Sequence, residues 1–136
     1  MDKKLEDVEE LKKVPKFTLE GYVTKARFCQ IYDGDTCKAV FPFEGKLYKW
    51  SCRLIAIDTP ELRTKNLKEK EAAREAKKAL KELLEGKTLE ITCHEFDKYG
   101  RLLIDIKLEN ETVSKNLIRR GFGRTYDGGR KKPWVF

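Results

Sequence analysis

Residues 53–61, RLIAIDTPE, combine an apolar strand with charged groups at both ends. Arg53 precedes the apolar residues 54–57, and Asp58 and Glu61 then bracket a Thr-Pro pair. Charged groups beside a buried strand are costly unless they have an opposite charge or a bound cation as partner. Because five residues of extended strand span about 17 Å, Arg53 meets the two carboxylates only if the strand bends strongly. We therefore expect a sharp bend in this stretch.

Strand patterns precede this stretch and a helix pattern follows it. Residues 17–32, 36–43 and 47–57 are rich in aromatic and β-branched side chains, and the turn sequences DGD and FEGK separate them. Residues 66–87 then carry apolar side chains at helical spacing, and Gly86 is suited to end the helix. The pattern predicts a three-stranded meander followed by a long helix.

Two further strands and a second helix complete the predicted elements. Residues 88–96 and 101–108 have strand patterns joined by a DKYG turn, and residues 112–122 fit a short helix that ends at Gly121. Five strands with a long helix between the third and fourth, and a short helix after the fifth, match an OB-type Greek-key barrel. The expected fold class is α+β, mainly β.

The length of 136 residues suits one domain with a single core. Before Pro15, apolar residues recur at every third position in a charged background, which predicts a short amphipathic helix. We expect an N-terminal helical extension over residues 1–15 and a single domain over residues 16–136. The apolar residues of the extension are Leu5, Val8, Leu11 and Val14.

Positive charge dominates the chain, with 30 Lys and Arg against 23 Asp and Glu and a net charge of +7. This balance favours an anionic partner such as nucleic acid. Residues 115–132 hold seven basic side chains and one acid. They are either a solvated tail or a surface for phosphate groups, with interleaved aromatic side chains to stack on bases. The aromatic side chains are Phe122, Tyr126 and Trp134.

Neither a membrane-spanning run nor the apolar centre of a signal peptide is visible in the sequence. We therefore expect no membrane partner, a monomer and an intracellular location, with secretion after removal of a signal peptide as the open alternative. Four cysteines without CxxC spacing, and one histidine, favour reduced and largely buried thiols over a zinc site. These residues are Cys29, Cys37, Cys52, Cys93 and His94.

Three polar segments lie at predicted turns or strand ends: residues 32–36 (YDGDT), 53–61 and 96–101 (FDKYGR). Each one alone is explained as a turn or a helix cap. Taken together, their side chains complement one another chemically. Asp35 and Asp58 supply the carboxylate oxygens that a hard cation such as Ca²⁺ or Mg²⁺ prefers.

The remaining charged groups of these segments suit a phosphate. Arg53 and Arg101 carry planar guanidinium groups that grip a phosphate and stabilise the extra charge of its transition state. Glu61 follows the metal carboxylate closely and is placed to take a proton from an attacking water. A cation, two arginines and a carboxylate base are the groups that phosphodiester hydrolysis needs.

The motifs DGDT, RLxxIDTPE, DKYGR and LIRRG, in this order, resemble the staphylococcal nuclease (thermonuclease) family over residues 17–126. The resemblance implies an SNase-like OB-fold and a calcium-dependent endonuclease. Such a hydrolase cleaves phosphodiester bonds of DNA and RNA with little sequence specificity and leaves 3′-phosphate and 5′-hydroxyl ends. Calcium is then the expected cofactor, with Mg²⁺ as a substitute.

The resemblance also implies a metal site and a base. Asp35 and Asp58 would be metal ligands, together with the main-chain carbonyl of Thr59. Glu61 would be the general base that activates water.

The same resemblance implies which residues hold the substrate. Arg53 and Arg101 would bind the scissile phosphate and its transition state. Lys98 and Tyr99 match positions that contact a terminal phosphate, and Tyr126 is the nearest match to a further family tyrosine.

Functions of another class stay open. Nuclease-like OB modules with degenerate sites bind nucleic acid or scaffold proteins without cleaving, and a structural or zinc-binding protein with an incidental basic tail is a third alternative. Catalysis is favoured because all five chemical positions are present here: Asp35, Arg53, Asp58, Glu61 and Arg101.

Overall fold

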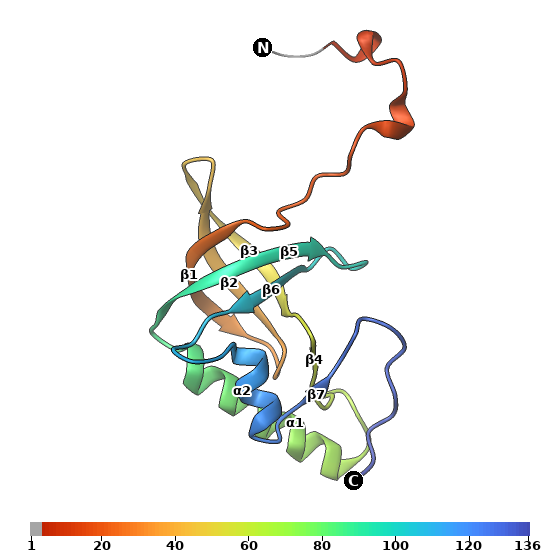
Figure 1. Cartoon of the computed structure of the whole chain (residues 1–136). Helices are drawn as coiled ribbons and strands as arrows, with labels where there is room; N and C mark the ends of the chain where they lie inside the picture. The colour runs from red at the N-terminus through yellow and green to blue at the C-terminus, as the bar shows by residue number, and fades with distance from the viewer. Residues whose placement is uncertain (1–3) are drawn as a thin grey trace.

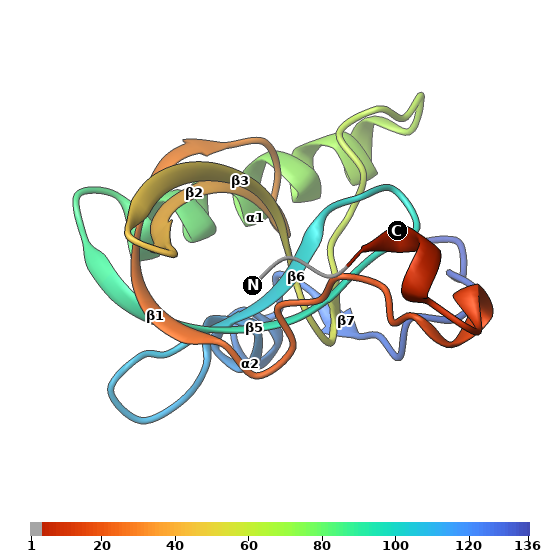
Figure 2. The same cartoon turned by 90° about the horizontal axis from the view of Figure 1, so that it is seen from above.

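Five strands close into a barrel in the order β1-β2-β3-β6-β5, which Figure 2 shows along its axis. The computed structural model describes residues 4–136. Neighbouring strands are antiparallel except β3 and β6, which pair in parallel. The predicted mainly β, OB-type barrel is confirmed. Its strands are β1 Val23–Ile31, β2 Thr36–Phe43, β3 Lys46–Leu54, β5 Thr88–Phe96 and β6 Leu102–Ile106.

Two helices cover one end of the barrel (Figure 1). Helix α1, Leu67–Leu84, begins where the Asn66 side chain accepts hydrogen bonds from two first-turn N–H groups, and it ends just before Gly86. Helix α2, Val113–Arg119, begins where the Thr112 side chain accepts a hydrogen bond from the N–H of Lys115. Both were predicted. The face of α1 that packs on the barrel is buried at Ala73, Ala76, Ala79, Leu80 and Leu84.

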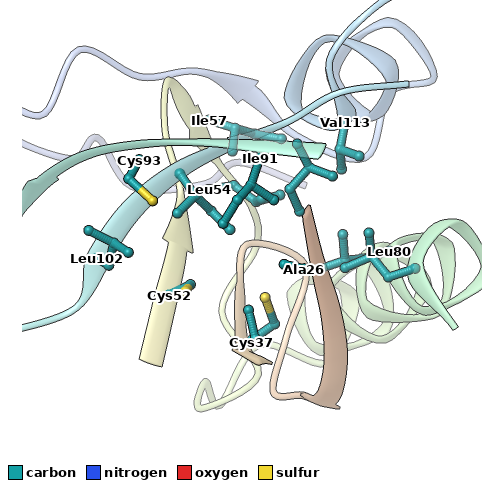
Figure 3. Close-up of a cluster of buried hydrophobic side chains, with 14 of the residues drawn as sticks. Ala26, Cys37, Cys52, Leu54, Ile57, Leu80, Ile91, Cys93, Leu102 and Val113 are labelled. Atoms are coloured by element: carbon teal, nitrogen blue, oxygen red, sulfur yellow. The ribbon is translucent and has the colours of Figure 1, made fainter. Parts of the chain in front are cut away.

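The core joins side chains of the strands and of both helices (Figure 3). Cys37, Cys52 and Cys93 lie in it, whereas Cys29 is exposed. Burial raises the pKa of Cys37 to about 12 and that of Cys93 to about 11. These thiols stay protonated at neutral pH and are poor nucleophiles. The prediction of largely buried thiols holds for three of the four cysteines.

The stretch that was predicted as one strand, residues 47–57, is broken by a sharp bend. Strand β3 ends at Leu54, and Ala56 has a left-handed backbone with φ 66°. The chain then continues as β4, Ile57–Asp58, which pairs outside the barrel with β7, Arg124–Thr125. The expected bend is confirmed, but the small β4–β7 sheet was not predicted.

Hydrogen bonds from three other elements hold the bend. The N–H of Ile55 donates to the carbonyl of Ile104 in β6, at 3.0 Å. The hydroxyl of Ser114 in α2 donates to the carbonyl of Ile55, at 2.8 Å. The N–H of Tyr126, just after β7, donates to the carbonyl of Ala56, at 3.1 Å. The bend is therefore fixed by the barrel, a helix and the outer sheet together.

The N-terminal segment does not form the predicted amphipathic helix. From residue 4 on it has two single 3₁₀ turns, Leu5–Asp7 and Leu11–Lys13, with no buried residue in either. Residues 1–3 lie outside the described part of the chain. Apolar side chains at every third position match the three residues per turn of a 3₁₀ helix better than the 3.6 of an α-helix.

In the part of the chain that the structure describes, no helix is both long and apolar enough to cross a membrane.

We expect Ala56→Val to lower the free energy of unfolding by about 1–2 kcal/mol, because a β-branched side chain is poorly accommodated at positive φ. Ala56 is exposed, so a larger side chain gains no core contact there. Urea unfolding measures the change. Ala56→Gly is the matched control and should be at least as stable as the wild type. Equal stability of the valine variant would contradict a strained bend.

Candidate functional site

Arg53 lies beside both predicted metal carboxylates, since the pairing of β2 with β3 places Asp35 next to it and the bend turns Asp58 back towards it. Its Nη2 atom lies 3.4 Å from Asp35 Oδ2 and 3.9 Å from Asp58 Oδ1. All three residues are buried, and Asp58 is only 1% exposed. Because a buried charge needs a partner, each of these groups depends on the others. The predicted meeting of the two strand ends is thus present in the structure.

The loop that carries Asp35 is held by its neighbour Asp33. Asp33 Oδ1 accepts hydrogen bonds from the N–H of Asp35 and from the N–H and hydroxyl of Thr36. Between the two acids, Gly34 packs so closely that an added Cβ would lie 2.8 Å from the Cβ of Ala76 in α1. Only glycine therefore lets the DGD loop sit against the helix. The N–H of Thr59 donates to Asp35 Oδ2, at 3.1 Å.

Asp58 is surrounded by cations. Arg124 donates to its Oδ2 from Nε at 3.1 Å and from Nη2 at 2.9 Å. The Nζ of Lys131 lies 3.5 Å from Oδ1, an oxygen that is buried and receives no hydrogen bond. Neither Arg124 nor Lys131 was predicted to contact this carboxylate. In the β4–β7 sheet Arg124 lies directly opposite Asp58, and a two-residue strand leaves no periodic signal in the sequence.

The basic stretch 115–132 is therefore not a uniform solvated tail. Arg124 and Lys131 neutralise Asp58, and Arg119 pairs with Glu111 at 2.7 Å. Some of the basic side chains that were predicted to contact phosphate groups are thus paired with acidic side chains of the same domain.

Glu61 is exposed and lies at the edge of this cluster. Its Oε1 is 3.6 Å from Lys131 Nζ, so one ammonium bridges Glu61 and Asp58. Its backbone N–H donates to Glu69 Oε2 at 3.0 Å, which ties it to the first turn of α1. An exposed carboxylate beside Asp58 has the access to water that a base needs.

Arg101 is positioned by the DKYG turn. Asp97 accepts a hydrogen bond from Arg101 Nε at 2.7 Å, and its other oxygen accepts from the N–H groups of Tyr99 and Arg101. Burial raises the pKa of Asp97, but these hydrogen bonds outweigh burial and hold the pKa below its ordinary value. The exposed Tyr99 ring lies under both cations of the turn, Arg101 and Lys98.

A cavity of about 860 Å³ joins the two parts of the site. Arg53, Tyr99 and Arg101 line it, and Tyr126 and Lys131 line it from the C-terminal segment. The Tyr126 ring lies 5.2 Å from the guanidinium of Arg53, within cation–π range. Arg53 and Lys131 both contact the carboxylates and both face the cavity, so they connect the acidic cluster with the open cleft.

The donor chemistry of the cluster fits a hard cation. Asp35, Asp58 and the carbonyl of Thr59 offer only oxygen, and Asp58 Oδ1 is buried without a hydrogen-bond donor. Within residues 4–136, no three His, Cys, Asp or Glu side chains are grouped closely enough to hold a metal ion. The structure thus brings together two carboxylates of the predicted set, Asp35 and Asp58, around Arg53.

Burial raises the pKa of Asp35 to about 7, the charge of Asp33 adds to this, and Arg53 opposes it. When no cation is bound, Asp35 therefore takes up a proton at a higher pH than an ordinary aspartate.

A closed OB-type barrel, buried carboxylates paired with arginine, and a basic cleft define the class as a nuclease-like OB-fold domain. More specifically, the chain belongs to the family of staphylococcal nuclease homologues, whose family model matches residues 51–133.

Three relatives illustrate the likeness. Endonuclease YncB of Bacillus subtilis (strain 168) is 34% identical over 95 residues, which are 68% of this chain and 43% of the relative. SPbeta prophage-derived endonuclease YokF of the same organism is 33% identical, over 68% of this chain and 31% of the relative. Probable staphylococcal-like nuclease CAN1 of Oryza sativa subsp. japonica is 29% identical, over 62% and 24%. The chain thus spans less than half the length of each of these relatives.

Without a metal ion, the free energy of unfolding should fall as pH rises from about 4 to about 7. The pKa of Asp35 is about 7 in the folded chain against 3.8 ordinarily, so the folded state binds a proton that the unfolded state has lost. This contribution is full below pH 3.8 and is lost as pH rises through 7. Urea unfolding in a chelator at several pH values measures it. Asp35→Asn should remove this part of the pH dependence, and an identical profile for both proteins would contradict it.

Proposed function

We propose that the domain is a metal-dependent endonuclease that hydrolyses phosphodiester bonds of DNA and RNA with little sequence specificity and leaves 3′-phosphate ends. One observation carries the proposal: Arg53 contacts both buried carboxylates, at 3.4 Å and 3.9 Å, and also lines the cavity that Arg101 lines. A phosphate in that cavity would meet two guanidinium groups beside a cation-binding cluster. Membership of the nuclease family supports the same function.

Ca²⁺ is the proposed cofactor, with Mg²⁺ as a substitute. Asp35, Asp58 and the carbonyl of Thr59 would hold it, since they are the hard oxygen donors of the cluster. When bound, such an ion neutralises phosphate charge and makes a coordinated water more acidic.

The two arginines are proposed to bind the scissile phosphate and to stabilise its transition state. Arg53 is buried and held by three neighbours, including the carbonyl of Leu54 at 3.1 Å. Arg101 is held by Asp97 but keeps part of its side chain exposed. Fixed donors in a partly dry site stabilise developing charge at little reorganisation cost.

Glu61 is the proposed base that takes the proton of the attacking water. It is exposed and lies next to Asp58 through their shared contact with Lys131. Lys98, Tyr99 and Tyr126 are proposed to bind the substrate, because they line the same cavity and offer an ammonium, a phenol and ring faces.

The alternative function is a non-catalytic module that binds nucleic acid or scaffolds proteins. The observation in its favour is that Arg124 and Lys131 already occupy the carboxylate of Asp58. A cleavage assay separates the two functions.

The test incubates the purified protein with plasmid DNA, single-stranded DNA and RNA, with CaCl₂, MgCl₂ or a chelator. We expect cleavage with calcium, none with the chelator, and product ends that accept a label at the 5′ position without prior phosphatase treatment. Strong cleavage in chelator would refute the metal dependence. Binding of all three nucleic acids without any cleavage would support the non-catalytic module.

Replacing Arg53 or Arg101 by Met should lower kcat by about 10²- to 10³-fold, since each removes a donor to the developing charge. Glu61→Gln should also lower kcat because the amide cannot accept the proton. Arg74→Met is the control, since Arg74 is an exposed residue of α1 whose ion pair is with Glu71 on the same helix. Initial rates at saturating substrate measure the effect. Full activity in an arginine variant would remove that residue from the mechanism.

A further inference from the structure

The segment after β7 folds back onto the site and is called the strap here, residues 127–136. In Figure 1 it leaves β7 as a wide loop and returns towards the body of the molecule. The carbonyl of Lys132 accepts a hydrogen bond from Arg124 Nη2, and the ring of Trp134 stacks 3.9 Å from the Arg124 guanidinium. The strap is therefore fastened to the same arginine that holds Asp58.

The two cations at Asp58 are held very differently. Arg124 belongs to β7, makes two hydrogen bonds to Oδ2 and is two-thirds buried. Lys131 belongs to the strap, makes no hydrogen bond to Oδ1 and lies at ion-pair distance from it, 3.5 Å, with its side chain 43% exposed. A two-point guanidinium contact is a fixed partner, whereas a single ammonium on a flexible stem is easily replaced.

Lys131 and a divalent metal ion would compete for the same carboxylate, Asp58. Its Nζ lies between Asp58 Oδ1 and Glu61 Oε1, at 3.5 Å and 3.6 Å. A divalent cation on Asp58 would lie close to this ammonium, and like charges at such a distance repel each other strongly in a partly buried site. The carboxylate therefore cannot keep both partners in this geometry.

We propose that Lys131 is a built-in, displaceable counter-ion that covers Asp58 and Glu61 until a divalent cation replaces it and loosens the strap. The proposal rests on the proposed metal dependence and adds a regulation of that site. With Lys131 in place, the ammonium group pairs with both Asp58 and Glu61, so the resting enzyme is stable but inactive. A divalent cation must then break both ion pairs of Lys131 before it binds, and this free-energy cost lowers the affinity of the site for the cation.

The experiment titrates CaCl₂ into the full chain by calorimetry at pH 8 and 0.1 M KCl, comparing the wild type with Lys131→Gln. An exposed or half-exposed ion pair changes an equilibrium constant by about two- to fivefold, so losing two should tighten calcium binding by about four- to twenty-five-fold. Lys131→Arg keeps the charge and should bind calcium as weakly as the wild type.

Lys132→Gln is the matched control. It removes the same charge at the next residue. Within residues 4–136, Lys132 contacts the site only with its backbone carbonyl, which the substitution keeps. Its calcium affinity should stay within about twofold of the wild type, because at this ionic strength distant charges are largely screened. A tightening as large as that of Lys131→Gln would show a general charge effect and would overturn the proposal.

Fluorescence of Trp134, measured in a Trp50→Phe background that leaves it as the single tryptophan, gives a readout that is independent of activity. With Lys131 present, quenching of this fluorescence by acrylamide should increase when calcium is added, because Trp134 stacks on Arg124 while the strap is closed. In Lys131→Gln the quenching should be high already without calcium. Equal calcium affinity of the wild type and Lys131→Gln would overturn the strap proposal alone. No calcium or magnesium binding by either protein would overturn the proposed metal dependence together with it.

Discussion

The bend at Ile55 and Ala56 is the constraint on which the rest of the structure depends. It ends the barrel strand β3, starts the outer β4–β7 sheet, and turns Asp58 back towards Arg53. An extended strand would keep those two charges about 17 Å apart. The backbone groups of the bend form hydrogen bonds with β6, with α2 and with the residue after β7. The barrel, a helix and the C-terminal segment therefore all meet at Ala56, the residue with the strained backbone. Strain of this kind persists only where the surroundings determine the conformation, and it is common at functional sites.

Charge balance at the bend follows from this geometry. Asp58 is buried and has Arg53, Arg124 and Lys131 within 4 Å, so its negative charge is more than compensated. Burial raises the pKa of Asp35, the neighbouring acid Asp33 adds to this rise, and of these three cations Arg53 alone contacts Asp35 and opposes it. A divalent cation would therefore gain most at Asp35, where charge is lacking, and would compete most at Asp58, where charge is already supplied. The two predicted ligands are chemically alike but electrostatically unequal.

The sequence was sufficient to predict the strands and helices with a strong apolar periodicity and to locate the polar motifs of the site. The barrel strands, α1 and α2 were predicted in type and order, and the bend followed from the need of Arg53 and Asp58 to meet. Residues 5–14 were misjudged because a spacing of three was taken for an α-helix when it fits 3₁₀ turns. The β4–β7 sheet carries no periodic signal, and its register places Arg124 opposite Asp58. Lys131 reaches Asp58 from the strap, which has no secondary structure to predict. Tertiary contacts between short segments far apart in the chain are what a pattern cannot show.

The lining of the cleft supports the proposed lack of sequence specificity. Specific recognition of bases relies on amide and guanidinium groups aimed at base edges, whereas phosphate contacts carry no sequence information. Among residues 4–136, the lining of the cleft includes no Asn or Gln, and Arg53 and Arg101, the proposed phosphate ligands, are each held in place by a carboxylate of the domain. Tyr99 and Tyr126 add ring faces, which stack on any base. A site of this composition, if it binds nucleic acid as proposed, would recognise the phosphate backbone and the faces of the bases, but would hardly distinguish one base from another.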